Sequence, residues 1–373
     1  MSGGAIDLSG NAEFNINVQG SGKMFGTGTV DVRGDARVRF TNDGYARITP
    51  DAPYQTLTLN FSGDSQLESC IANEYFGGSY TGATTVVNAS GNAKLWFGSA
   101  KFGYGGMPGA SCELNISEHA IVSNKNALSI GTGGTAVAPS LGRVKITGGI
   151  LRSDAAGGGG FILGYDPATI MAGIYNRATL EISGGAVSNA VDYYSRNFIV
   201  GQGNSYGEVL QSGGIIAQGY GGSYVGYKGG MGLYRFTGGT ADFSKGSLNI
   251  GSDGGKGTLE VGAGTGTFTA KSMNLAGAGA TLKFKLGADG SLATLGVTGA
   301  LTIGSGAKLE VDASECTDGA NVTLMTFGSR TGEFASGDIE VVSAPGRMIC
   351  NVQQLDNKIR FVMRKQGFMV IVR

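Results

Sequence analysis

The sequence contains one histidine, one tryptophan, four cysteines and six prolines among its 373 residues. The cysteines, which are Cys70, Cys112, Cys316 and Cys350, form no CxxC pair, so we expect no zinc site, no other metal and no cofactor. Cys316 and Cys350 either form one disulfide near the C-terminus or remain free thiols. Catalysis by a Ser–His–acid triad would require His119, and no nucleophile elbow surrounds a serine in this sequence.

An excess of positive charge is also absent. Lysine plus arginine equals aspartate plus glutamate at 28 each, and no segment is strongly basic. Nucleic acids and anionic membranes are therefore not expected partners. No apolar run approaches membrane-spanning length, so we expect no direct membrane insertion. Patterned sequence follows residues 1–4 directly, without the regions of a signal peptide, so we expect the chain to belong to a longer secreted protein.

Glycine, by contrast, is abundant, with 69 copies. These copies follow no Gly-X-Y register, which excludes collagen. A hydrophobic share of 41% argues against disorder, because it provides enough apolar surface to fold. The glycines are therefore expected to serve many tight turns inside an ordered fold.

Two short motifs repeat along the chain. The first is an alternating strand followed by Ser-Gly or Thr-Gly, at intervals of 24 to 36 residues. The second is an alternating strand that ends in Gly, and from Gly201 to Ala276 it recurs every 25 residues. The first motif occurs at 6–12, 30–36, 59–64, 87–93, 114–117, 144–149, 180–185, 210–214, 234–239 and, in a degenerate form, 259–262. The second occurs at 128–131, 161–164, 198–201, 224–226, 248–251 and 273–276.

A period near 25 residues fits one triangular coil of three short strands and three turns. In such a coil, Leu180 and Ile182 point inward and Glu181 points outward, and the following glycines turn the chain. The sequence thus predicts an all-β parallel β-helix of ten to twelve coils over residues 1–311, with almost no helix. Longer alternating strands over 312–373 predict a C-terminal β cap, and 368–373 form part of that cap or a sorting tail. We expect these residues in the core: Ile146, Ile182, Val200, Phe236 and Ile250.

The copies at 144–149, 180–185 and 234–239, together with the stretch 281–311, resemble the β-strand repeats of autotransporter passenger domains. The resemblance covers most of the chain and is specific for architecture. It implies a right-handed parallel β-helix that is exported and displayed at the surface of a Gram-negative bacterium, or secreted. The leader and translocator of that family are not recognised in these residues.

Polysaccharide hydrolases and lyases also use parallel β-helices, so catalysis has to be considered. Hydrolases need clustered carboxylates, and the sequence has no Asp-Asp pair. Glu181, Glu208 and Glu260 are isolated, and two coils separate Glu181 from Glu260. A calcium-binding Gly-Asp pattern occurs once, at 251–255, and forms no array. We therefore predict a structural or adhesive module without catalytic residues. The alternative is a carbohydrate-binding or polysaccharide-degrading β-helix.

The longest steps in the repeat lie between residues 117 and 212, so the loops there should project furthest. They are rich in tyrosine, which offers flat apolar area with a polar tip at a low cost in entropy. We expect glycans or surface proteins, from a host or the environment, as ligands, and self-association along the rod is a further expectation. Alternatively, the rings only cover coil edges and pack on one another. The predicted ligand residues are Tyr165, Tyr175, Tyr193, Tyr194, Gln202, Tyr206 and Tyr227, with Tyr165, Gln202 and Tyr227 on one face.

Arg33, Gly34 and Asp35 form an Arg-Gly-Asp tripeptide, which integrins recognise on exposed loops. The same residues also occupy the corner that Ser-Gly-Asn fills at 9–11 and 90–92. The sequence leaves both readings open, a receptor motif and a simple turn.

Overall fold

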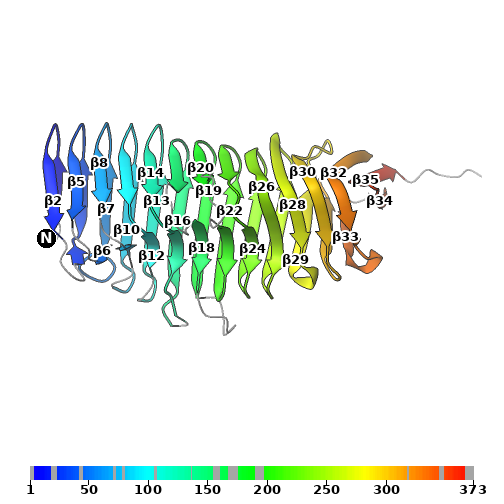
Figure 1. Cartoon of the computed structure of the whole chain (residues 1–373), viewed down its shortest axis with the longest axis horizontal. Helices are drawn as coiled ribbons and strands as arrows, with labels where there is room; N and C mark the ends of the chain where they lie inside the picture. Colours follow the sequence, from blue (N-terminus) through cyan, green and yellow to red (C-terminus); the bar gives the residue numbers. More distant parts are fainter. Residues whose placement is uncertain are drawn as a thin grey trace, which may run out of the picture.

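The chain winds into a parallel β-solenoid of about 11 turns (Figure 1). The computed structural model describes residues 4–17, 23–41, 45–69, 73–77, 80–104, 107–135, 137–153, 160–166, 175–189, 197–316, 319–343 and 348–365. Within these ranges the only helices are two 3₁₀ turns, η1 (Gly277–Gly279) and η2 (Ser336–Asp338). The all-β prediction is therefore confirmed.

One side of the solenoid is a single sheet of 13 strands, each hydrogen-bonded in parallel to its equivalent in the next coil. We call it the first sheet. Its strands are β1 (Gly4–Leu8), β4 (Gly28–Val32), β7 (Thr56–Phe61), β10 (Thr84–Ala89), β13 (Ser111–Ile116), β16 (Ser140–Ile146), β19 (Asn176–Ile182), β22 (Ser205–Gln211), β25 (Met231–Phe236), β27 (Lys256–Gly262), β29 (Ala280–Lys285), β31 (Lys308–Ala313) and β33 (Ile339–Ser343). The first repeat motif ends each of the first ten strands.

The other two sides are parallel stacks. The second stack contains β2 (Glu13–Asn17), β5 (Arg37–Thr41), β8 (Gln66–Ser69), β11 (Lys94–Phe97), β14 (Ile121–Asn124), β17 (Ile150–Ser153), β20 (Ala186–Asn189) and β23 (Ile215–Gln218). The third stack contains β3 (Lys23–Phe25), β6 (Tyr45–Thr49), β9 (Asn73–Phe76), β12 (Ala100–Tyr104), β15 (Leu128–Thr132), β18 (Phe161–Tyr165), β21 (Phe198–Gln202) and β24 (Ser223–Tyr227). After these come β26 (Gly239–Ser252), β28 (Gly266–Leu275) and β30 (Thr294–Ile303), each running through both stacks, and β32 (Ala320–Thr331).

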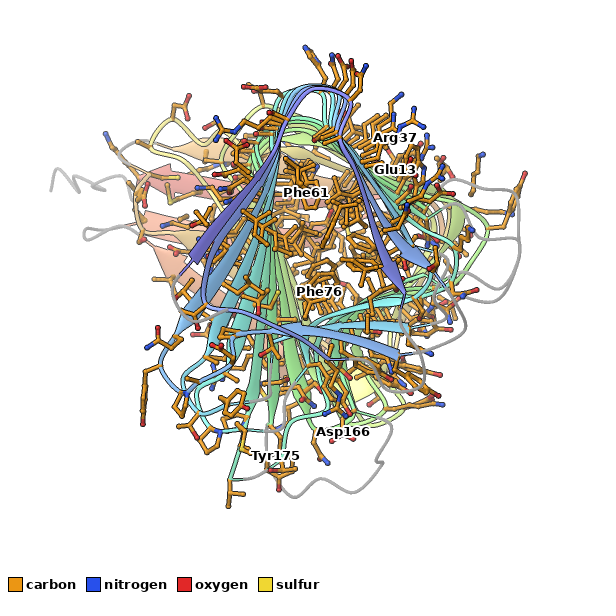
Figure 2. The ribbon with its side chains drawn as sticks, turned by 90° about the vertical axis from the view of Figure 1, so that its left-hand side faces the viewer. Glu13, Arg37, Phe61, Phe76, Asp166 and Tyr175 are labelled. Carbon is orange, nitrogen blue, oxygen red and sulfur yellow. The ribbon has the colours of Figure 1, made fainter. Side chains whose placement is uncertain are left out.

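Figure 2 views the solenoid from its N-terminal end and gives its hand. The chain passes Phe61 on one side, crosses the upper corner toward the side of Glu13 and Arg37, and continues to Phe76 on the lower side. This path is clockwise as the coils recede from the viewer, so the solenoid is right-handed, as predicted. Right-handed crossovers are also the rule for parallel strands, because strand twist favours them.

The interior is filled by inward ladders of apolar side chains. The five predicted core residues between Ile146 and Ile250 are all at most 1% exposed, which confirms them. Some inward positions carry polar residues, for example Gln211, where neighbouring coils place Ile182 and Phe236. The Gln211 amide donates to the carbonyl oxygen of Thr240, and its side-chain oxygen accepts from the Tyr234 hydroxyl at 2.6 Å. These partners satisfy a polar group that would otherwise be costly to bury.

Glycines from two sides meet at the corner between the third stack and the first sheet. Gly226 has a φ of +71°, and a Cβ there would overlap the carbonyl oxygen of Lys256. Gly232, in the first sheet, in turn packs directly against the backbone nitrogen of Gly226. Only residues without a side chain allow both backbones to approach this closely. The glycine that ends the second motif therefore allows the tight corner between the third stack and the first sheet. The residue that follows this glycine lies at the outer surface of that corner.

The two ends of the solenoid differ. At the C-terminal end, β35 (Lys358–Lys365) pairs antiparallel with β32 and with β34 (Met348–Gln354). At the N-terminal end, β1 and β2 are paired on one side only among the described residues. Phe14, which is on an inward ladder with Val38 and Leu67, is consequently 41% exposed.

The division into 1–311 and 312–373 stays a prediction, because parallel pairing continues through β33. Residues 368–373 lie outside the described ranges, and Cys316 and Cys350 are not joined by a disulfide.

A buried carboxylate joins the third stack to the corner of the next coil. Glu74 is fully buried and accepts hydrogen bonds from the backbone N–H groups of Gly98 and Ser99, each at 3.0 Å. It also accepts one from the Ser69 hydroxyl. Burial raises the pKa of Glu74 above its usual value of 4.5, although these hydrogen bonds oppose the rise.

We expect Gly226→Ala to destabilise the solenoid by about 2–4 kcal/mol, because it adds a methyl group at positive φ against the Lys256 carbonyl. Gly337→Ala is the matched control, since no atom lies within 4 Å of the added Cβ. Thermal unfolding followed by circular dichroism measures both. Equal melting temperatures for the two variants would contradict the role of this corner.

We expect Glu74→Gln to change how stability depends on pH. A pKa raised in the folded state contributes stability below the unfolded value near 4.5, and this is lost as the pH rises through the folded pKa. The difference in unfolding free energy between the native protein and the variant should therefore shift in favour of the variant as the pH rises above about 4.5. Denaturant unfolding at pH 4, 5, 6 and 7 tests this, and a pH-independent difference would contradict it.

Candidate functional site

Tyr165, Gln202 and Tyr227 lie on consecutive coils and pair in register at the ends of β18, β21 and β24. We call these three residues the tyrosine ladder. Thr132 and Ser252 continue it by one coil on either side. The prediction that the three residues share one face is thus confirmed. Their role in ligand binding stays a prediction.

Tyr224, which the sequence analysis did not select, belongs beside this ladder. Its ring stacks on that of Tyr227 with 4.3 Å between the centroids and 29° between the planes. The Lys228 ammonium lies 5.2 Å from the centroid of the Tyr227 ring. Both rings are half-buried, and burial raises the pKa of Tyr224. The sequence contained a signal for the exposure of Tyr224, because this residue occupies the outward position in its copy of the second motif. The contact also fits the alternative reading, in which the rings pack on one another.

The other predicted tyrosines lie elsewhere. Tyr206 is on β22, in the first sheet and across the corner, with the Arg177 guanidinium carbon 5.8 Å from its ring centroid. Tyr175 precedes β19 and donates its backbone N–H to the carbonyl oxygen of Asn204 at 2.8 Å. Figure 2 shows Tyr175 near Asp166 at the lower corner. Tyr193 and Tyr194 lie outside the described residues.

The Arg-Gly-Asp tripeptide forms a corner after β4. Gly34 has a φ of +63° and stacks between the backbones of Gly10 and Gly63. The Arg33 guanidinium lies 3.0 Å from the Asp7 carboxylate, so it is already engaged within the fold. The turn reading is therefore confirmed, and receptor recognition by Arg33, Gly34 and Asp35 stays a prediction.

Side chains of opposite charge pair along the outer face of the first sheet. Arg143 pairs with Glu181 at 2.7 Å, and Arg235 pairs with Glu260 at 2.8 Å. Lys283 lies 3.7 Å from the second oxygen of Glu260. The hydrogen bonds that Arg143 donates to Glu181 raise the pKa of Arg143. Glu181 and Glu260 are thus each engaged by a cation.

Glu181 and Glu260 do not form a carboxylate pair with each other. Leu210 and Arg235 intervene in the register, so three rungs, roughly 14 Å, separate the two positions along the stack. Hydrolases place their two carboxyl groups about 5–9.5 Å apart. The shallow groove beside them, of about 440 Å³, is lined in part by Lys145, Glu181 and Arg235.

A second aromatic group, also not selected from the sequence, lies on the outer face of the third stack in earlier coils. It consists of Tyr45, Arg47, Tyr75, Lys101 and Tyr104, and we call it the amino-terminal tyrosine cluster. The sequence contained a signal for this cluster. Residues 75–77 and 101–103 each consist of an outward residue, an apolar residue and a glycine, which is the pattern of the second motif.

Among the described residues, no group of three or more His, Cys, Asp or Glu side chains could hold a metal ion. In the same ranges no helix has the length and apolar character needed to cross a membrane. Comparison of the chain with protein-family models, curated proteins and solved structures gives no match.

Proposed function

We propose that the protein is a secreted or cell-surface structural and adhesive module of the kind found in Gram-negative autotransporter passengers. The observation that carries this proposal is the unbroken register of the first sheet, in which 13 strands stack in parallel from β1 to β33. At about 4.8 Å per strand this gives a rod roughly 60 Å long. Such a rod holds a binding face at a fixed distance from its attachment point.

The tyrosine ladder with Tyr224 is the face we propose for contact with glycans or surface proteins. Its rings are half-buried, so their orientation is fixed while part of each ring stays accessible. A pre-oriented ring loses little conformational entropy when a sugar or an apolar side chain stacks on it. Gln202, between Tyr165 and Tyr227, adds an amide that can both donate and accept hydrogen bonds.

Export and surface display are supported by the strand–Ser/Thr–Gly–Gly repeats, which resemble those of autotransporter passengers. The solenoid fold is compatible with that role. The proposal includes no catalysis.

The combined variant Tyr165→Ala, Tyr224→Ala, Tyr227→Ala should lose adhesion to cells or glycan arrays, at least about tenfold, because it removes the stacking surface. Tyr54→Ala is the control, since Tyr54 is 78% exposed and belongs to a different coil. Adhesion is measured on variants whose melting temperatures remain high enough for the assay. Undiminished adhesion of the triple variant would refute this face as the site.

We expect no turnover of pectins, glycosaminoglycans or host glycans, because Glu181 and Glu260 lie about three rungs apart and each is neutralised by a cation. Product release is followed by chromatography after prolonged incubation. Turnover that disappears in Glu181→Gln or Glu260→Gln would favour the alternative, a polysaccharide-degrading β-helix.

A further inference from the structure

The amino-terminal tyrosine cluster combines flat rings with cations on three consecutive coils. Arg47 on β6, Tyr75 on β9 and Lys101 on β12 pair in register, so a tyrosine lies between two cations along one column. The two cationic positions are two rungs apart, about 10 Å. Tyr45 and Tyr104 lie on either side of Tyr75, with ring centroids 6.0 Å and 4.6 Å from its own.

Lys101 lies against two rings of this cluster. The Lys101 ammonium is 4.7 Å from the Tyr75 ring centroid and 5.9 Å from that of Tyr104. It also donates to the Tyr75 hydroxyl at 3.4 Å. Burial and Tyr45 raise the pKa of Tyr75, and the positive charge of Arg47, one coil earlier, opposes this rise.

Arg47 and Lys101 differ from the paired arginines of the first sheet and its corner. On the first sheet, Arg33, Arg143 and Arg235 are each paired with a carboxylate. No ion pair within the described residues engages Arg47 or Lys101. Two cations that have no ion pair among the described residues, next to partly exposed rings, are complementary to an anion that carries an apolar face.

We propose that the amino-terminal tyrosine cluster binds a linear acidic polysaccharide that lies along the solenoid axis. Sugar rings offer the C–H face that stacks on tyrosine, and their carboxylate or sulfate groups offer the charge for Arg47 and Lys101. The separation of the two cations suits acidic groups on alternate sugars of an extended chain. Tyr45, 49% exposed, provides the accessible end of the platform. This site is separate from the tyrosine ladder and does not depend on it.

The test measures binding of the full chain by calorimetry at physiological salt. Polygalacturonate and hyaluronan present carboxylates, heparin presents sulfates as well, and dextran is the neutral control. Polyglutamate and vesicles of phosphatidylserine and phosphatidylcholine present charge without sugar rings. We expect binding to one or more of the acidic polysaccharides and to none of the other probes; the arm that binds identifies the acidic group. Binding to none of them, or equal binding to polyglutamate or to vesicles, overturns the proposal.

Variants locate the site. Lys101→Gln and Arg47→Gln should each weaken binding about tenfold, the loss expected for one charge-assisted hydrogen bond. Lys94→Gln removes the same charge from an exposed position on the second stack and should change affinity less than twofold. Tyr45→Leu should weaken binding although it changes no charge, because it removes a ring on which a sugar can stack.

Equal losses of affinity for Lys94→Gln and Lys101→Gln, or full affinity in Tyr45→Leu, contradict the proposal. The Tyr165, Tyr224 and Tyr227 variant should keep this affinity, so this site and the proposed adhesive face can fail separately.

Discussion

Parallel pairing in register between one coil and the next is the constraint on which the whole molecule depends. It places each side chain directly above its equivalent, so the outer surface is organised in columns rather than patches. Asn60, Asn88 and Asn115 illustrate this, because each amide donates to the side-chain oxygen one coil earlier, at 2.7 to 2.9 Å, and the chain of bonds ends at Asp31. A column of identical amides satisfies itself, whereas a column of identical charges would repel itself. On the first sheet, Glu260 accordingly lies between Arg235 and Lys283 in the register.

The same register governs the interior, where it limits the places that polar residues can occupy. Asn189 donates to the Gln218 side-chain oxygen at 2.8 Å in an inward column. Gln211 likewise depends on Tyr234, which is on the following coil. These two buried amides are each hydrogen-bonded to a side chain of the following coil.

The repeat period predicted the strands, the corners and the tyrosine ladder, because a side chain's place in a coil follows from its distance to the motif glycine. That reasoning placed Tyr165, Gln202 and Tyr227 on one face although they are far apart in the sequence. It missed the amino-terminal tyrosine cluster, whose coils carry less regular copies of the motif. It also could not foresee the contact between Tyr224 and Tyr227 or the engagement of Arg33 by Asp7, since rotamers and ion pairs depend on neighbours in other coils. The burial of Glu74 could not be predicted from the sequence for the same reason, because its hydrogen-bond donors Gly98 and Ser99 belong to the next coil.

The one-sided pairing of β1 and β2 has a mechanical consequence. Tension applied to the amino terminus loads the bonds of the outermost coil first, and each coil that opens passes the load to the next. With a period of 25 residues, each step releases roughly 90 Å of extended chain. At the opposite end, β35 is held by antiparallel neighbours on both sides. Under such a load the described coils open one after another, so the length rises in discrete increments and work is dissipated at each of them.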